Sequence, residues 1–346
     1  MGEDIGQKRS WLPPFLDRKY VFDEGDNFSI AYVGDMHLHC SNFRSRVDNY
    51  PETCIEKLGI LRKEMNSRGI KYLFCPGDIF HVPKERTDFE FAVMKEFYKF
   101  RDLGIKVFVS TGNHDISQER IENIEKSSLG LLYLSEAVLP FTKVTFRRGN
   151  KVPIVVTGLH FPNDVEPIQD LNAYNILACH KFYNIVGEPS IFEKDLDFLG
   201  YNMYLMNHDH VPYPLKQVKT SSGMVTIVRP GSFMRATSHS YNTNRMVYMD
   251  EIKFNGHVEV IRNTLPVRAP EEIFSANTVD RVEDNSLMNI SRQMVELVTK
   301  MYEIDESGLS IYTILDQTSI DVKVKERIVM YLESFGIFRK RVSENI

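Results

Sequence analysis

Seven side chains of the kinds that bind divalent metal ions fall into five short clusters along the chain. In two clusters the side chains are separated by one residue, Asp35 with His37 and His208 with His210. Side chains two positions apart on an extended backbone share a face, so each pair can point at one site. Together the clusters predict a binuclear metal centre, which could polarise a phosphate ester and supply hydroxide at neutral pH. The predicted ligands are Asp35, His37, Asp78, Asn113, His180, His208 and His210.

Each cluster on its own has an ordinary structural interpretation, such as a capping aspartate, a hydrogen-bonded histidine or a turn asparagine. The most specific cluster is Gly112-Asn113-His114-Asp115, which combines a turn glycine, an amide able to bind a metal and an adjacent imidazole. The conjunction of all five clusters in this order favours the metal centre over the separate interpretations.

Three predicted strands alternate with two predicted helices in the first third of the chain. Such alternation implies parallel strands joined by right-handed crossovers. Side chains just beyond the carboxyl ends of such strands gather at one edge of the sheet, so Asp35, Asp78 and Asn113 should meet there. Pro51 suits the first turn of the first helix, and Gly69 suits its end. The strands are expected at 29–33, 70–75 and 105–110, and the helices at 51–68 and 87–103.

After Val138 the apolar segments become short, with little helical pattern between them. Two of them, 246–254 and 257–261, are joined at Asn255-Gly256, which is a strong signal for a β-hairpin. A second sheet facing the first is the simplest arrangement of these strands. We therefore predict an α/β fold in which a two-sheet sandwich is flanked by helices. The other short strands are expected at 144–147, 152–159, 175–179, 201–206, 214–218 and 225–228.

A chain of 346 residues is long enough for one large domain and a smaller appendage. Its composition becomes polar after Leu265, and apolar side chains return at helical spacing further on. We predict an N-terminal arm at 1–26, a main domain at 27–265, a linker at 266–286 and a small helical C-terminal domain at 287–346.

The overall composition excludes fewer possible functions than the clusters of predicted ligands do. The net charge of −5 neither indicates nor excludes a nucleic-acid binder, because bound cations would change the local charge. The four cysteines show no CxxC spacing and are expected to be reduced thiols. The acidic N-terminus lacks the apolar run of a secretory signal, and no apolar run is long enough to cross a bilayer. A cytoplasmic protein with no membrane contact is expected.

The ordered set of clusters resembles the calcineurin-like metallophosphoesterase superfamily, over roughly residues 28–262. The resemblance implies that Asp78 bridges two metal ions and that His114 acts on the phosphate or the leaving group. Mixed oxygen and nitrogen ligands suit Mn²⁺, and Fe or Zn²⁺ could also occupy such a site. The resemblance further implies one ion held by Asp35, His37 and His210, and a second held by Asn113, His180 and His208.

Two further motifs narrow the resemblance within that superfamily. Gly77-Asp78-Ile79-Phe80-His81 resembles the GD-x-F-H signature of SbcD-type nucleases, and residues 229–235 resemble their PGS-x-x-R stretch. Protein phosphatases of the superfamily instead carry an arginine soon after that aspartate, and here the first is Arg86. The resemblance implies a DNA exonuclease/endonuclease subunit of a recombination and repair complex, partnered by a coiled-coil SbcC-type ATPase. A bacteriophage origin, which the economy of the chain suggests, would place it in the host cytoplasm.

Catalytic and substrate-binding roles follow from the same likeness. His114 is expected to stabilise or protonate the leaving oxygen, and His81 to orient the phosphodiester. Arg44, Arg46 and Arg235 are the candidate contacts to DNA phosphates, although each is also an ordinary surface charge when taken alone.

Two residues depart from the pattern of the family. His39 stands where the family usually has a glycine, and we expect it at the rim of the site. Asn207 stands where a glycine usually precedes the last histidine pair, and it is expected either to strain the turn or to adopt a left-handed backbone.

Two other functions stay open at this point. One is a phosphodiesterase or phosphatase acting on a small nucleotide or another phosphoester, and the other is an inactive scaffold. The complete ligand set argues against the scaffold. The helix at 87–103 also carries a surplus apolar face with Phe91, Met94 and Tyr98. That face predicts either a homodimer or burial beneath the N-terminal arm.

Overall fold

The computed structural model describes residues 12–168, 170–238 and 240–275. The chain divides into two units, Met1–Val279 and Asp280–Ile346, and all of the described residues belong to the first. The helical domain predicted at 287–346 therefore lies outside the described residues. So do the start of the arm predicted at 1–26 and most of the linker predicted at 266–286.

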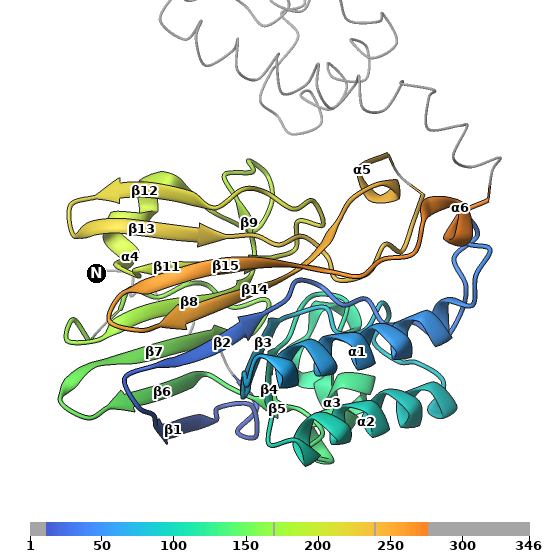
Figure 1. The fold of residues 1–346 in the computed structure, drawn as a ribbon, viewed down its shortest axis with the longest axis horizontal. Coiled ribbons are helices and arrows are strands. Elements are labelled where there is room, and N and C mark those ends of the chain that lie inside the picture. The colour runs from blue at the N-terminus through green and yellow to red at the C-terminus, as the bar shows by residue number, and fades with distance from the viewer. Residues whose placement is uncertain (1–11, 169, 239, 276–346) are drawn as a thin grey trace, which may run out of the picture. The chain divides into compact units, whose positions relative to one another are not determined.

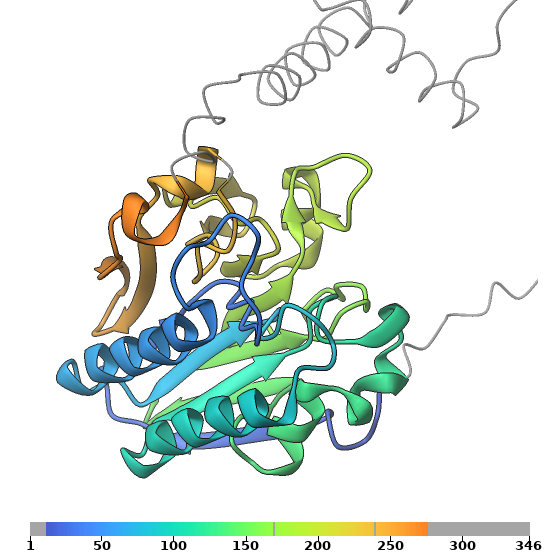
Figure 2. The same cartoon turned by 90° about the vertical axis from the view of Figure 1, so that its right-hand side faces the viewer.

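A mixed sheet carries the first three clusters of predicted ligands. Within the described residues its strand order is β15-β14-β2-β3-β4-β5, and β2 to β5 run parallel. Helices α1 (Tyr50–Ser67) and α2 (Thr87–Asp102) cross between the parallel strands and lie side by side on one face of the sheet (Figures 1 and 2). The strands are β2 (Phe28–Tyr32), β3 (Tyr72–Pro76), β4 (Lys106–Ser110), β5 (Leu139–Pro140), β14 (Val247–Phe254) and β15 (Val258–Leu265).

A second mixed sheet supplies the remaining predicted ligands. Its order in the described part of the chain is β1-β6-β7-β8-β11-β13-β12, and β8 runs parallel to both β7 and β11. The strands are β1 (Lys19–Asp23), β6 (Lys143–Arg148), β7 (Lys151–Leu159), β8 (Tyr174–His180), β11 (Met203–Asn207), β12 (Lys216–Thr220) and β13 (Gly223–Val228).

Short elements complete the described residues. A small parallel pair is formed by β9 (Phe182–Tyr183) and β10 (Ser190–Ile191).

No helix in the described ranges is both long and apolar enough to pass through a lipid bilayer. The short helices are α3 (Ser128–Leu134), α4 (Leu196–Leu199), α5 (Ser240–Thr243) and α6 (Pro270–Ile273), with 3₁₀ turns at Ser117–Glu119, Ile121–Lys126 and Glu193–Asp195.

The parallel strands β2, β3 and β4 of the first sheet are largely apolar on both sides because both faces of the sheet are covered there. Leu73 and Val107 pack in the core beneath the helices, whereas Tyr32, Phe74 and Phe108 pack in the core between the two sheets. Alternate side chains of a strand point to opposite faces, so a strand buried on both sides reads as a continuous apolar run. Each buried aromatic ring contributes about 1.5–3 kcal/mol to folding. These strands are therefore a firm base for the loops that follow them.

The local signals of the first helix are confirmed. Asn49 precedes α1, and its side-chain oxygen accepts a hydrogen bond from the backbone N–H of Glu52. Pro51 stands in the first turn, and Gly69 follows the helix with a positive φ of 68°. The cap, the proline and the glycine are the expected start and stop of a helix.

The second apolar face of α2 is largely occupied within the chain itself. Met94 and Tyr98 pack against the core beneath the helices, and the Tyr98 hydroxyl donates to the backbone oxygen of Ser135 at the end of α3. Phe91 remains 49% exposed. Most of the surface that suggested a homodimer is thus covered by a neighbouring segment, and the homodimer stays a prediction.

The α/β two-sheet fold is confirmed, with two corrections to how its parts are joined. Part of the predicted arm is the edge strand β1, which pairs in parallel with β6. Tyr20 and Phe22 of β1 pack against the ring of Phe108, with ring centroids 5.2 and 6.1 Å apart. The predicted hairpin exists as β14 and β15, but it extends the first sheet beside β2 rather than the second sheet.

Candidate metal centre

The seven predicted ligands come together beyond the carboxyl ends of five strands. Asp35, Asp78 and Asn113 follow β2, β3 and β4 of the first sheet. His180 is the last residue of β8, and His208 follows β11 directly, so the second sheet reaches the same place. The gathering at strand ends that the sequence predicted is what the structure shows.

One group of ligand atoms is formed by Asp35, His37 and His210, which all lie within 4.8 Å of one another. The Nε2 atoms of His37 and His210 are 2.8 Å apart, and Nε2 of His210 lies 3.7 Å from Oδ2 of Asp35. Asp35 and His37 are almost wholly buried. A carboxylate and two imidazoles facing one point have the geometry of a metal site.

A second group is formed by Asp78, His180 and His208, again within 4.8 Å of one another. Nε2 of His180 lies 2.9 Å from the Oδ1 atom of Asn113, which brings the amide to this group. The Oδ2 atom of Asp78 lies 3.4 Å from Nε2 of His180 and 3.7 Å from Nε2 of His37. One carboxylate oxygen therefore reaches both groups, as a bridging ligand must.

Buried polar atoms test whether these residues fit a pair of cations. Among the described residues, the Oδ2 atom of Asp78 is a buried acceptor without a hydrogen-bond partner. A buried polar atom left unsatisfied costs about 1–3 kcal/mol. Divalent cations would satisfy such acceptors, and a mixture of oxygen and nitrogen donors suits Mn²⁺, Fe or Zn²⁺. The donor set therefore fits two divalent metal ions.

Burial makes most of these imidazoles neutral. It lowers the pKa of His208 to about 3, with a further contribution from neighbouring His180. The pKa values of His37 and His210 are lowered for the same main reason. Metal ligation requires an unprotonated ring nitrogen. These side chains consequently offer free lone pairs at neutral pH.

The two aspartates and His180 are linked electrostatically. Burial, with a contribution from Asp35, raises the pKa of Asp78 to about 7 even though His180 opposes it. Burial alone would also raise the pKa of Asp35, but His180 and the other imidazoles outweigh it and lower that pKa. Asp78 and Asp35 in turn overcome the effect of burial on His180 and raise its pKa to about 9. Without a cation, a proton is therefore held between His180 and the carboxylates.

Three of the predicted ligands have a left-handed backbone, which residues other than glycine rarely adopt. The φ angles are 45° at His37, 50° at Asp78 and 88° at His208. Each such residue costs on the order of 1–3 kcal/mol, and such strain concentrates at functional sites. A left-handed backbone was one of the two expectations for Asn207, but the positive φ falls one residue later. Asn207 instead ends β11 and accepts a 2.6 Å hydrogen bond from the Tyr32 hydroxyl.

Two glycines allow the loops of the centre to approach closely. A Cβ atom on Gly112 would lie 2.1 Å from Oδ1 of Asp78. A Cβ atom on Gly34 would lie 2.0 Å from the backbone oxygen of Gly231. Neither distance is possible for real atoms, so these positions require glycine.

His114 and His81 lie beside the predicted ligands. The backbone N–H of His114 donates to Oδ1 of Asp78 at 3.0 Å. Its Nδ1 lies 2.6 Å from the backbone oxygen of His81, which can only accept, so Nδ1 carries the hydrogen and Nε2 is left for other contacts. The two rings stack 5.2 Å apart, and His114 lies 5.0 Å from the ring of His37. Burial, with His114 and His39, lowers the pKa of His81 to about 4.

Two of the three arginines expected to contact DNA are built into the interior. Arg46 is 7% exposed, forms an ion pair with Asp48 and donates to the backbone oxygen of Arg235. Arg235 is 5% exposed and donates to the backbone oxygens of Thr243 and Arg268. Neither guanidinium is presented to a ligand in solution, which corrects the expectation for both. Arg44 is exposed on the loop after the first cluster.

The PGS-x-x-R stretch that contains Arg235 supports the centre from behind. The backbone N–H of Phe233 donates to the backbone oxygen of Asp35 at 2.8 Å. The backbone N–H of Ser232 donates to the backbone oxygen of His210 at 3.1 Å. This stretch therefore holds two ligand loops in register.

Asp115 and His160 are positioning residues that the motifs alone did not reveal. The fully buried carboxylate of Asp115 accepts from the backbone N–H groups of Phe80 and Gly112, which ties two ligand loops together. His160 accepts from the backbone N–H of Thr111 at 3.2 Å, and burial lowers its pKa to about 4. Asp115 could have been noticed because it ends the most specific motif. No pattern marks His160.

His39 lies at the rim of the site, where it pairs with Glu85. Its Nδ1 is 2.8 Å from a carboxylate oxygen of Glu85, and the other oxygen accepts from the backbone N–H of Cys40. The ring of His39 lies 5.2 Å from that of His81. The departure from glycine thus adds a partly buried hydrogen-bonded pair, His39 with Glu85, next to His81.

Comparisons with known proteins agree with this geometry. A family model described as calcineurin-like phosphoesterase matches residues 28–219, more than half of the chain and all seven predicted ligands. No curated protein was found to match.

Two solved structures are similar at low identity. The protein TT1561 of Thermus thermophilus is 10% identical, with 68% of this chain and 99% of that chain covered and a TM-score of 0.39. A second crystal structure is 9% identical, with 69% and 100% covered and a TM-score of 0.40. No conclusion rests on likenesses of this degree.

Proposed function

Because the chain belongs to the calcineurin-like phosphoesterase family of metal-dependent phosphoester hydrolases, we propose that its substrate is DNA and that it cleaves phosphodiester bonds with two metal ions. The observation that carries this proposal is the pair of stacked imidazoles, His81 and His114, 5.2 Å apart beside the ligand groups. A second imidazole in this position, from a motif that resembles the SbcD-type nucleases, gives a diester phosphate an additional hydrogen-bonding partner.

Asp78 is the proposed bridge between two divalent ions, with Mn²⁺ the preferred metal and Fe or Zn²⁺ the alternatives. When bound, such a pair of cations polarises the phosphate ester and supplies hydroxide at neutral pH. Each ion would have three ligands of its own, Asp35, His37 and His210 for one and Asn113, His180 and His208 for the other.

His114 is the proposed partner of the leaving oxygen. Its Nδ1 is fixed by the backbone oxygen of His81, which sets the tautomer and the orientation of the ring. Its remaining nitrogen, Nε2, is then the atom that can hold or transfer a proton at the leaving group. The hydrogen bond from its own backbone to Asp78 keeps the residue close to the bridging carboxylate.

His81 is the proposed orienting residue for the phosphodiester. Its lowered pKa keeps the ring neutral at pH 7, so it can donate one hydrogen bond to a phosphate oxygen without binding the product as a cation would. Its ring packs edge-on against Phe43 at 4.8 Å and stacks on His114, which restricts its rotation.

Partners and location are part of the same proposal. DNA, a coiled-coil SbcC-type ATPase subunit and a second copy of the chain are the proposed partners, in a recombination or repair complex in the cytoplasm. Arg44 is the remaining candidate for a DNA phosphate contact, because it is exposed beside the first cluster. A contact of this kind is independent of sequence and weakens as salt rises.

The test is digestion of labelled single-stranded and double-stranded DNA by the full chain with Mn²⁺, beside the His114→Ala variant. Cyclic nucleotides and a simple phosphomonoester are supplied to the same preparations. We expect DNA to be cleaved by the wild type and not by the variant. Turnover of the small phosphoesters with none of DNA would replace DNA by a small-molecule substrate.

A further inference from the structure

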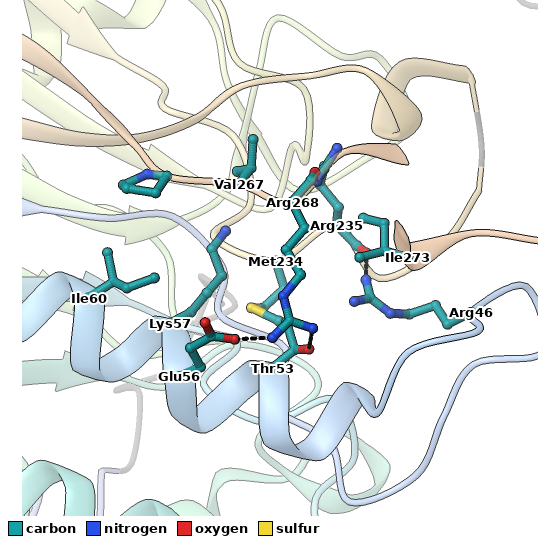
Figure 3. Close-up of a pocket in the computed structure, with 11 residues that line it drawn as sticks. Arg46, Thr53, Glu56, Lys57, Ile60, Met234, Arg235, Val267, Arg268 and Ile273 are labelled. Atoms are coloured by element: carbon teal, nitrogen blue, oxygen red, sulfur yellow. Dashed lines mark hydrogen bonds and ion pairs between the residues drawn. The ribbon is translucent and has the colours of Figure 1, made fainter. Parts of the chain in front are cut away.

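A second group of charged residues surrounds a pocket behind the metal-ligand loops. The pocket has a volume of about 170 Å³ and lies between α1, the segment after β13 and the segment that follows β15 (Figure 3). None of the seven predicted metal ligands lines it. It is therefore a site separate from the centre.

Cations outnumber carboxylates around this pocket. The charged side chains that line it are Arg46, Lys57, Arg235, Arg268 and a single carboxylate, Glu56. Figure 3 shows Arg268 extending across the pocket to Glu56 and Thr53 on α1, while Lys57 rises from the same helix. Positive charge that converges from separate segments is the arrangement that binds anions.

Not all of these cations are available. The guanidinium of Arg46 is held by the carboxylate of Asp48, 2.8 Å from Nε, and Arg235 donates to backbone oxygens. Arg268 is different because its side chain is 45% exposed and its nearer carboxylate partner, Glu56, is 51% exposed. The buried carboxylate of Asp48 lies further away, 3.9 Å from a guanidinium nitrogen of Arg268. A ligand can therefore take over Arg268 from Glu56, while Asp48 keeps its ion pair with Arg46.

Lys57 is a buried cation with a single hydrogen-bond partner among the described residues. The residue is 7% exposed, and its ammonium donates to the backbone oxygen of Phe233 at 2.8 Å and lies 5.1 Å from the Phe233 ring. An ammonium has three hydrogens to donate. Within the described ranges no carboxylate forms an ion pair with it. Burial, together with Arg245, Arg235 and Arg46, accordingly lowers the pKa of Lys57 well below its usual value.

An anion between Lys57 and Arg268 would supply the missing negative charge and acceptors. The cavity volume is about 170 Å³. A tetrahedral oxyanion fits in that space, whereas ligands the size of a nucleoside occupy pockets of about 300 Å³ or more. We propose that this pocket binds a phosphate group, either as free phosphate or as the end of a phosphomonoester that extends into solvent. Lys57 and Arg268 are its principal contacts.

This proposal does not depend on DNA being the substrate. Phe233 connects the two sites, because its backbone oxygen accepts from Lys57 and its backbone N–H donates to Asp35. The metal centre can also bind phosphate as a product, so the experiment must separate the two sites by variants.

The test is calorimetric titration of the full, Mn²⁺-loaded chain, free of unbound metal, with inorganic phosphate and then with a deoxynucleoside 5′-monophosphate. The variants are Lys57→Met and Arg268→Gln, with Lys63→Met as a control that removes an exposed cation from the same helix. We expect the wild type and Lys63→Met to bind phosphate at a site in addition to the metal centre. Each pocket variant should bind phosphate at that additional site about tenfold more weakly or worse. If the nucleoside monophosphate also binds at that additional site, the ligand is a phosphomonoester. If only inorganic phosphate binds there, the ligand is the free ion.

Identical isotherms for the wild type and both pocket variants would overturn the proposal. Because Arg268 is half-exposed, Arg268→Gln decides the matter if Lys57→Met does not fold, which circular dichroism shows. DNA cleavage by the same preparations is measured in parallel, so that a failed nuclease assay and a failed phosphate site remain distinguishable.

Discussion

The metal centre and the phosphate pocket lie on opposite sides of one short segment, residues 231–235. The metal centre has buried acceptor atoms without donors, whereas the pocket has donor hydrogens without acceptors. On the front side the unsatisfied buried atoms are acceptors, such as Oδ2 of Asp78. On the rear side the excess lies in donors, with Lys57 the clearest case. Buried acceptor atoms that receive no hydrogen bond favour the binding of a cation. Ammonium hydrogens that have no acceptor favour the binding of an anion.

The comparison shows how to separate structural charges from charges that await a ligand. Arg46 is as deeply buried as Lys57, yet its guanidinium is neutralised by Asp48 and stacks 4.6 Å from the ring of Tyr50. The Tyr50 hydroxyl donates to the backbone oxygen of His37, so this pair supports a ligand loop. Burial alone therefore says little about function, whereas the count of partners does.

The largest effect is expected from Asp78→Ala. Removal of the carboxylate whose Oδ2 atom lies near both His37 and His180 should release both metal ions and abolish hydrolysis. Metal content of the purified variant is measured by mass spectrometry beside Asp102→Ala, which removes an exposed carboxylate at the end of α2. Retention of both ions by Asp78→Ala would remove its bridging role.

His114→Ala is expected to keep both metal ions and to lose about 10²–10⁴-fold in the rate of hydrolysis, the usual contribution of general acid–base catalysis. The imidazole is not a member of either proposed ligand set. His257→Ala is the matched control, because it removes an exposed imidazole from the β14–β15 turn. An unchanged rate in His114→Ala would show that the leaving oxygen is served by another group.

Arg46→Met tests the interpretation that the buried arginine Arg46 stabilises the fold rather than binding a ligand. The side chains of Arg46 and Asp48 are 1% and 5% exposed, and loss of one member of a buried pair leaves the other uncompensated. The free energy of unfolding should fall by about 3–5 kcal/mol. Arg44→Met, on the same loop but exposed, should change it by about 0.5 kcal/mol or less. Urea unfolding measures both, and equal stability of the two variants would contradict the assignment.

Acid should weaken metal binding. The pKa values of Asp78, about 7, and His180, about 9, mean that both groups carry a proton in the metal-free protein at lower pH. A metal ion must displace these protons, so its apparent affinity falls as pH falls, about tenfold per pH unit for each proton displaced. Titrations with Mn²⁺ at pH 8 and pH 6, in two buffers of different ionisation enthalpy, measure the protons released. A pH-independent affinity would contradict this electrostatic picture.

Much of the centre follows from the sequence because its geometry depends on strand ends. Apolar runs locate β2, β3 and β4, and the position of Asp35, Asp78 and Asn113 after them fixes which edge they share. The hairpin signal at Asn255-Gly256 predicts that β14 and β15 pair, but not which sheet they extend. That choice depends on contacts between segments far apart in the chain.

Other features had no local signal. Arg46 and Arg235 look like surface charges, because nothing in their neighbours indicates that Asp48 and backbone oxygens will enclose them. The left-handed backbone falls at His208 rather than at Asn207, whose side chain accepts a hydrogen bond from Tyr32 in the other sheet. Tertiary contacts of this kind override local preference and are visible only in the folded chain.

The central claim is that Asp78 joins two cations, and a crystal structure of the Mn²⁺-loaded chain with anomalous scattering tests it most directly. The account predicts two anomalous peaks roughly 3.5–4 Å apart, each within bonding distance of Asp78. A single peak, or two peaks of which one lies out of reach of Asp78, would contradict it.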